Sequence, residues 1–478
     1  MPTTTRIKNA SWLVAWDAAA KRHQYLRDAD LIFTGNTIDH VGRDYRGRAD
    51  VEIDGKDLVL LPGLIDLHSH PGLEPIYKGV REEHGVPEMY MSGLYERMQS
   101  FMPDLEGMRA SSEIAYAELL KSGVTTIVDL MFPFDGWLEL LAKSGLRAYA
   151  GPWYGSASWD LINNYSLRVR WDEPAGRQQL ERALRLMAEA EKHPSGRMKG
   201  IHCAGTIETV SEALFRDGIA HARANKMPFT THAAQSVLEF HEMTKRNGKT
   251  SIQWAEQIGI LGPQTIIGHG MIIDEHSWVH WHTRKDVPIL AATGTTVAHC
   301  PTPFSRYGQI MEDFGRYLRA GVNMGLGTDT FPHNLLEEMR TAAVFARIGA
   351  EDITTLTTAD VFTAATIGGA NALGRPDLGR LAPGARADIV VVDGRHVDMR
   401  PLRDPLRSLI YSAADRAVRD VYVDGTKVVA NGKVLTLDPD DAADRLTAAQ
   451  ARMEQETPKR DWARRQALEI VPLSLPLG

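Results

Sequence analysis

The sequence predicts an α/β protein in which a (β/α)₈ (TIM) barrel carries a β-sandwich built from both ends of the chain, and two observations support this prediction. Apolar strand segments alternate with amphipathic helical stretches, such as 177–192 and 334–348, through the middle of the chain. Short strand-like runs with Gly-Asn and Asp-Gly turn signals occupy 6–60 and return at 379–437. The expected barrel strands are 61–67, 123–130, 146–151, 198–203, 227–232, 264–269, 293–299 and 321–328.

These patterns divide the chain into three parts. The expected parts are a composite sandwich from 1–61 and 382–437, a barrel over 62–381, and a C-terminal helix and tail over 438–478. The charge-rich stretch 438–470 is typical of a solvated surface helix, with a subunit contact as the alternative. No GxGxxG or GxxxxGK[ST] motif follows a strand, which excludes the common nucleotide-binding sites.

Composition indicates a soluble globular enzyme. The 478 residues are 43% hydrophobic and 24% charged, and the net charge of −7 offers no basic field for a nucleic acid. Apolar runs are too short to span a membrane, and the first residues do not resemble a secretory signal. Only two cysteines, Cys203 and Cys300, occur, so we expect a reducing, cytoplasmic location and buried inert thiols.

Histidines fall at the ends of the expected barrel strands. His68 and His70 close the first strand in PGLIDLHSH, and a period of two places both imidazoles on one face. His232, His269 and Asp329 close the fifth, sixth and eighth strands. Barrel enzymes place their sites at these carboxyl ends, and imidazole and carboxylate are ligands that Zn²⁺ accepts. A metal site is therefore expected.

The ordered motifs PGLIDLHSH, THAAQ, GHG, AHCPTPFSR and GLGTDT resemble those of the amidohydrolase superfamily. The resemblance is strongest to the branch of cytosine, guanine and S-adenosylhomocysteine deaminases and triazine hydrolases, and it extends from about residue 6 to about 437. It implies a distorted (β/α)₈ barrel with a split β-sandwich, one divalent metal ion (zinc first, iron or manganese as alternatives), a small-molecule substrate and a homo-oligomer. A second metal would need a lysine ending the fourth strand, and Lys199 precedes that strand.

The resemblance also implies roles for individual residues. His68, His70, His232 and Asp329 correspond to the metal ligands, and His269 to the residue that contacts the activated water or the polarised substrate atom. His299 corresponds to a residue near the substrate, with packing under the barrel rim as the alternative. A metal at this site would activate water for attack on an sp² carbon, with Asp329 accepting the water proton.

Gln235 departs from the pattern of the deaminases, which carry a glutamate three residues after the fifth-strand histidine. A carboxamide cannot shuttle a proton, so Gln235 favours hydrolysis of an amide, urea, carbamate or lactam C–N bond in a small cyclic or aromatic molecule. The alternative is a heterocycle aminohydrolase (deaminase) in which another group serves. A dehydrating ring closure by the same site remains open, and a non-catalytic scaffold is disfavoured because the ligand set is complete.

Aromatic and methionine side chains follow several strands and predict a flat, largely apolar substrate, which Arg306 would bind if it carries a carboxylate. The residues expected to contact substrate are Trp153, Tyr154, Phe304, Arg306 and His333. Further candidates in the same loops are Tyr77, Met89, Tyr90, Met91, Tyr95, Met98, Trp159, Tyr307 and Phe331.

Overall fold

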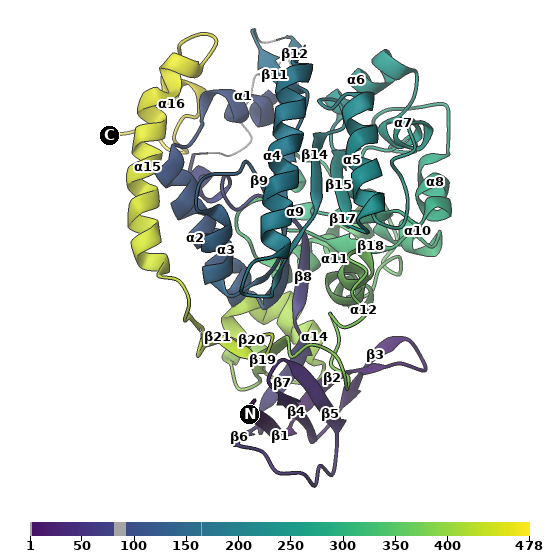
Figure 1. Cartoon of the computed structure of the whole chain (residues 1–478), viewed down its shortest axis with the longest axis vertical. Helices are drawn as coiled ribbons and strands as arrows, with labels where there is room; N and C mark the ends of the chain where they lie inside the picture. The colour runs from purple at the N-terminus through teal and green to yellow at the C-terminus, as the bar shows by residue number, and fades with distance from the viewer. Residues whose placement is uncertain (1, 81–91, 164) are drawn as a thin grey trace.

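A computed structural model describes residues 2–80, 92–163 and 165–478. Its barrel and its sandwich form the two ends of an elongated molecule, with both sandwich sheets below the barrel (Figure 1). Among the described residues, no helix has the length and apolar character needed to cross a membrane.

Eight parallel strands form the barrel in the order β18-β17-β16-β15-β14-β10-β9-β8. A parallel bridge between Ser69 and Asp329 joins the first strand to the segment after the last, which nearly closes the barrel. The predicted barrel is therefore confirmed, and each expected strand segment overlaps an observed strand. The barrel strands are β8 (Leu64–Ser69), β9 (Val124–Met131), β10 (Arg147–Tyr154), β14 (His202–Thr206), β15 (Phe229–Ala233), β16 (Thr265–His269), β17 (Thr296–His299) and β18 (Met324–Leu326), and the short β13 (Met198–Gly200) pairs with β10.

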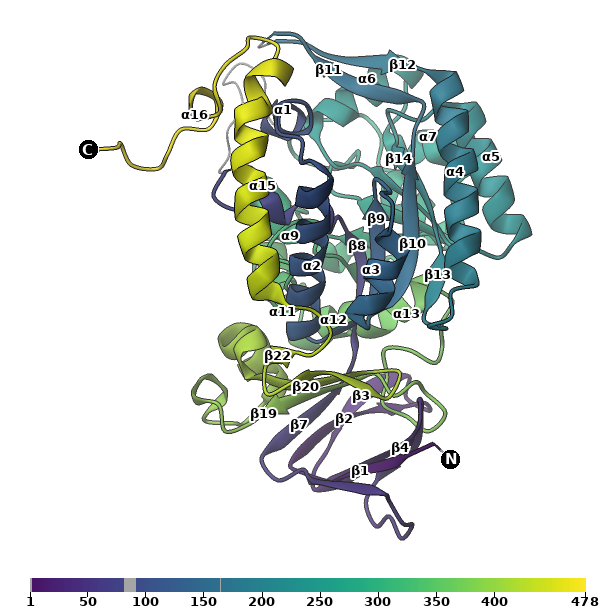
Figure 2. The ribbon, with the colours of Figure 1, turned by 60° about the vertical axis from the view of Figure 1, so that its left-hand side comes forward.

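Most of the helices lie around the barrel (Figures 1 and 2). The longer ones are α2 (Leu105–Lys121), α4 (Glu173–Glu191), α5 (Glu212–Ala224), α6 (Val237–Asn247), α11 (Leu335–Gly349) and α15 (Pro439–Arg460). Shorter ones are α1 (Ser92–Ser100), α3 (Trp137–Ser144), α7 (Ser251–Gln257), α8 (Asp286–Thr293), α9 (Pro301–Ser305), α10 (Phe314–Arg319), α12 (Thr358–Thr363), α13 (Gly369–Ala372), α14 (Pro405–Ser408) and α16 (Ala467–Ile470). Of these, α14 lies beside the sandwich and α16 lies beyond α15 (Figures 1 and 2).

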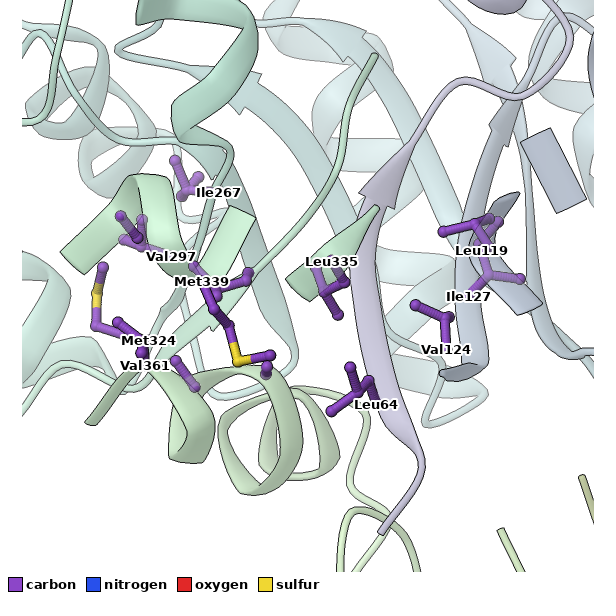
Figure 3. Packing of buried hydrophobic residues seen from close by; sticks show 14 of the residues in the cluster. Leu64, Leu119, Val124, Ile127, Ile267, Val297, Met324, Leu335, Met339 and Val361 are labelled. Atoms are coloured by element: carbon purple, nitrogen blue, oxygen red, sulfur yellow. The ribbon is translucent and has the colours of Figure 1, made fainter. Parts of the chain in front are cut away.

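The core lies between barrel strands and helices. Leu64 of β8 and Val124 of β9 belong to one buried cluster with Leu119, and Met324 and Met339 belong to the same cluster (Figure 3). Burying such side chains contributes about 25 cal/mol for each Å² of apolar surface removed from water. The barrel strands are buried along both faces, which explains why they read as continuous apolar runs in the sequence.

Strands from both ends of the chain build the sandwich, as the sequence predicts. β7 pairs antiparallel with β19, so residues near 60 and near 390 share one sheet. One sheet contains β5 (Thr37–Gly42), β4 (Ala29–Thr34), β1 (Thr4–Ala10) and β6 (Val51–Asp54). The other contains β22 (Lys433–Val434), β21 (Thr426–Ala430), β20 (Val418–Val423), β19 (Ile389–Asp393), β7 (Leu58–Pro62), β2 (Trp12–Asp17) and β3 (Arg22–Leu26).

The apolar run 58–65 forms two strands rather than one. β7 belongs to the sandwich and β8 to the barrel, and Gly63 stands between them. A Cβ at Gly63 would lie 2.1 Å from the Thr125 hydroxyl oxygen, so only glycine allows this close approach. At Gly63 the chain passes from the sandwich into β8, and His68 and His70 lie at the other end of this strand, at the mouth of the barrel.

Candidate metal centre and cavity

Four predicted ligands from three separate strands meet at the carboxyl end of the barrel. Ligand atoms of His68, His70, His232 and Asp329 lie within 4.8 Å of one another. Asp329 Oδ1 lies 3.5 Å from His68 Nε2 and 3.3 Å from His70 Nε2, and the Nε2 atoms of His70 and His232 lie 3.0 Å apart. Three imidazoles and one carboxylate form a donor set suited to Zn²⁺ or a similar ion.

Backbone carbonyls orient two of these imidazoles. The Nδ1–H of His70 donates to Leu130 O, and the Nδ1–H of His232 donates to Gly205 O, both at 3.1 Å. These bonds leave both Nε2 lone pairs facing one another, an arrangement that a cation between them stabilises. Neither ring nitrogen of the fully buried His68 has a hydrogen-bond partner among the described residues. The residues therefore fit a bound metal ion.

Burial keeps the ligand histidines neutral. Loss of hydration lowers the pKa of His68, His70 and His232 to about 3, because a buried imidazolium is poorly solvated. Neutral imidazoles present the lone pairs that a metal requires. The three histidines are therefore ready to bind a metal throughout the neutral pH range.

Asp66 joins the first and last strands beneath the ligands. Its carboxylate accepts hydrogen bonds from the His68 amide at 3.0 Å, the Thr328 amide at 3.2 Å and the Thr328 hydroxyl at 2.6 Å. The Asp329 amide in turn donates to His68 O at 2.7 Å. Asp329 has a φ of 57°, a left-handed conformation that this network holds in place.

His269 lies beside the ligands at the end of β16. Its ring centroid is 4.7 Å from that of His68 and 5.3 Å from that of His232. Burial and the neighbouring imidazoles lower its pKa well below the usual value, so the ring is neutral. A neutral histidine here can donate one hydrogen bond to a reacting atom, and the role expected for His269 stays a prediction.

A cavity of about 220 Å³ opens beside this cluster. His70, His232, His269 and Asp329 line it on one side. The rings of Phe132 and Trp153 stack at 5.0 Å and both line the cavity, so one wall is aromatic. Phe304, Tyr307, Trp159 and Met98 line it as well.

Gln235 lines the cavity and is buried. Its backbone is tied down, because its amide donates to Glu239 Oε2 at 2.9 Å and its carbonyl accepts from Gln309 Nε2 at 2.8 Å. Its side-chain nitrogen has no hydrogen-bond partner among the described residues. The carboxamide is therefore available to a ligand in the cavity.

Besides the buried ligand His68, four predicted site residues lie outside the described cavity lining. Tyr154 follows Trp153 on β10, and strand alternation turns its side chain outward, where its hydroxyl meets His202 Nδ1 at 3.1 Å. His299 precedes the first turn of α9 and packs on Phe314 with ring centroids 5.7 Å apart. Its contact with substrate and its packing under the barrel rim both stay predictions.

Arg306 and His333 are engaged by neighbouring loop residues. Arg306 donates to Phe331 O at 2.6 Å, and its guanidinium lies 4.5 Å from the Phe331 ring centroid, so the structure shows it bound within the loop rather than facing the cavity. His333 Nδ1 lies 2.9 Å from the Thr328 hydroxyl, behind the metal cluster. Their contacts with substrate remain predictions without support from this geometry.

The cavity also contains residues that the sequence analysis did not select. Glu74, Leu73, Leu94, Gln99, Phe132, Thr206, Thr209 and Thr330 line it. Glu74 follows the second metal ligand by four residues, and this proximity to His70 was the signal that could have found it. Tyr77 and Tyr95 are fully buried, whereas Met89, Tyr90 and Met91 lie outside the described residues. Both cysteines are buried, as predicted.

Residues 59–428 match the model of the amidohydrolase family. The chain belongs to this family. A 5-methylthioadenosine/S-adenosylhomocysteine deaminase of Thermococcus kodakarensis is 30% identical over 401 residues, which cover 83% of this chain and 88% of that protein. A 5'-deoxyadenosine deaminase of Methanothermobacter thermautotrophicus is 26% identical over 86% of this chain and 92% of that protein.

Solved structures show the same fold. A zinc-bound adenosine deaminase from Xanthomonas campestris has a TM-score of 0.79 at 22% identity, covering 95% of this chain and 99% of that chain. The atrazine chlorohydrolase of Arthrobacter aurescens, complexed with zinc, has a TM-score of 0.77 at 24% identity, covering 93% of this chain and 100% of that chain. The predicted family and fold are thus confirmed, and the protein is a metal-dependent amidohydrolase.

Proposed function

We propose that this amidohydrolase is a zinc-dependent aminohydrolase that releases an amino group from a flat nitrogen heterocycle. The observation that carries the proposal is a complete ligand cluster beside a cavity walled by the stacked rings of Phe132 and Trp153. Two relatives named as deaminases of adenosine-type nucleosides support the same chemistry. These relatives favour deamination over the amide-type cleavage that we expected first because of Gln235.

Residues of this protein would transfer the protons and orient the substrate ring. His68, His70, His232 and Asp329 would hold a divalent ion, which would supply the Lewis acid needed to activate water. Asp329 accepts a proton from that water and returns it to the departing amine. Neutral His269 donates a hydrogen bond to the oxygen on which charge develops. The aromatic wall holds the ring flat and excludes bulk water, which strengthens these interactions.

A second candidate function is hydrolysis of an amide, urea, carbamate or lactam. Gln235 favours it, because a carbonyl already polarised by the metal needs no carboxyl group to protonate a ring nitrogen. For this function, the Gln235 amide nitrogen, which has no hydrogen-bond partner among the described residues, would donate to the substrate carbonyl oxygen.

Mass spectrometry of substrate mixtures separates the two. Zinc-loaded enzyme is incubated with aminopurines, aminopyrimidines and aminotriazines, and in parallel with aryl amides, ureas, carbamates and lactams, with Asp329→Asn as the inactive control. Replacement of an amino group by oxygen with release of ammonia would support the proposal. Splitting of a carbonyl compound with uptake of water, and no deamination, would contradict it and support the second candidate.

A further inference from the structure

Glu74 is a buried carboxyl group in the cavity that the chemistry described above does not use. Its residue is 3% exposed and lines the same cavity as His70 and Asp329. Its backbone amide donates to His70 O at 3.2 Å, so Glu74 stands one turn after a metal ligand.

The charge pattern of the described lining makes Glu74 distinctive. Glu74 and Asp329 are the carboxylates among those residues. Asp329 contacts the ligand histidines and handles the water proton. Glu74 is therefore the second group on the described lining able to give and take a proton as a carboxyl group.

The turn that carries Glu74 is held firmly. Leu73, Ile76 and Tyr77 are buried in one apolar cluster, and the Tyr77 hydroxyl donates to Phe101 O at 2.7 Å. A side chain of α15, Gln450, donates to Lys78 O at 2.9 Å just beyond the turn. A fixed backbone positions a proton-transfer group without the cost of ordering it at each turnover.

We propose that Glu74 is the proton shuttle of this active site, the task that Gln235 cannot perform. This inference rests on the proposed aminohydrolase function, in which the ring nitrogen next to the attacked carbon must be protonated. The deaminase relatives suggest a reaction that needs a carboxyl group, and position 235 does not provide one. Glu74, in the turn after the first barrel strand, would provide that group instead.

The proposed proton transfers balance. The water oxygen bonds to the ring carbon, one water proton passes to Asp329, and the Glu74 carboxyl gives its proton to the neighbouring ring nitrogen. The remaining hydroxyl proton then passes to Glu74, and Asp329 gives its proton to the amino group. The C–N bond breaks, ammonia leaves, and the product carries a carbonyl beside a protonated ring nitrogen.

Relocating the carboxyl group tests the inference. Glu74→Gln should lower kcat for deamination about 10²- to 10⁴-fold, while KM and zinc content change little. Adding Gln235→Glu to Glu74→Gln should restore about tenfold or more of the lost kcat, because the carboxyl returns to the cavity. Formate should partly rescue Glu74→Ala, which a purely structural role would not allow. Glu106→Gln, which alters a surface ion pair with Arg445, is the matched control.

The outcomes separate the two proposals. If the wild-type enzyme deaminates a substrate while Glu74→Gln keeps kcat and gains no benefit from Gln235→Glu, the shuttle assignment is wrong and the aminohydrolase function stands. If KM rises and kcat does not fall, Glu74 binds substrate without transferring a proton, and the inference is also overturned. If the wild-type enzyme deaminates nothing and splits carbonyl compounds instead, the proposed function fails and this inference fails with it.

Discussion

Single residues control the metal centre through contacts on the far side of each ligand. Asp66 does so for His68 and, through the neighbouring Thr328, for Asp329. Its carboxylate accepts from the amide of His68 on β8 and from the amide of Thr328 just after β18, at opposite ends of the barrel sheet. We expect Asp66→Ala to weaken zinc binding about 10- to 100-fold, since partners of this kind orient first-coordination ligands. Asp66→Asn keeps an acceptor oxygen, so its zinc affinity should fall less than that of Asp66→Ala. Competition with a zinc-binding dye measures both affinities, and equal affinities for Asp66→Ala and wild type would contradict this role.

A second residue-scale prediction concerns pH and Asp129. This side chain is fully buried and accepts hydrogen bonds from the Tyr116 hydroxyl at 2.6 Å and the Trp137 indole at 2.9 Å. Burial raises its pKa from 3.8 to about 7. The folded chain therefore holds a proton that the unfolded chain releases between about pH 4 and pH 7, so this group's contribution to stability falls as pH rises through that window.

Asp129→Asn removes this dependence, because an amide has no proton to lose. The free energy of unfolding of the variant relative to wild type should increase from pH 4.5 to pH 7. Urea unfolding of both proteins at several pH values measures it. If the free energies of unfolding of wild type and variant changed with pH in parallel, Asp129 would have an ordinary pKa in the folded protein.

At the scale of elements, α15 packs from outside the barrel against the turn that carries Glu74. It lies along α2 on the surface of the molecule (Figures 1 and 2). Its charges suggested a solvated helix, yet Leu446, Ala449 and Met453 recur at helical spacing and are buried. They share a cluster with Ile76 and Tyr77 of the turn that carries Glu74.

Met453→Ala should therefore affect both stability and substrate affinity. A buried methionine cut to alanine costs about 2–5 kcal/mol of unfolding free energy, and loosening the turn should raise KM. Urea unfolding and steady-state kinetics provide the measurements, with the exposed Gln455→Ala on the same helix as the control. A loss of stability with unchanged KM would show that the helix supports the fold without supporting the site.

At the scale of the whole molecule, a buried ion pair network joins barrel and sandwich. Arg147 of β10 contacts Asp388, next to β19, at 3.2 Å and Asp424, after β20, at 2.9 Å. Arg147→Ala leaves the buried Asp388 carboxylate without its cation, which costs about 3–5 kcal/mol of unfolding free energy. The half-buried Asp424, in contrast, keeps Arg386 at 3.4 Å.

An exposed pair provides the comparison. Arg177 and Asp217 are 2.9 Å apart on the surface. Because water screens such pairs, Arg177→Ala should cost about 0–1 kcal/mol. Equal losses in the two variants, measured by urea unfolding, would show that the interface between barrel and sandwich does not depend on Arg147.

Local patterns predicted most of the fold and the metal ligands. Apolar strands and turn signals are properties of short stretches, and the carboxyl end of a barrel strand is where His68, His232, His269 and Asp329 occur in the sequence. The substrate side was harder to predict. Trp153 and Tyr154 are neighbours in sequence, and only the orientation of β10 decides that the first faces the cavity and the second the helices.

The sequence by itself determined the alternation of strands and helices, the donor set for a metal ion and the absence of a glutamate at position 235. Each of these depends on residue type and short spacing. Only the tertiary structure decided that Asp66 links the two ends of the barrel sheet, that α15 buries an apolar stripe, and that Glu74 enters the cavity. The physical reason is that these contacts join segments up to several hundred residues apart, and which side chains meet there is set by how whole elements pack.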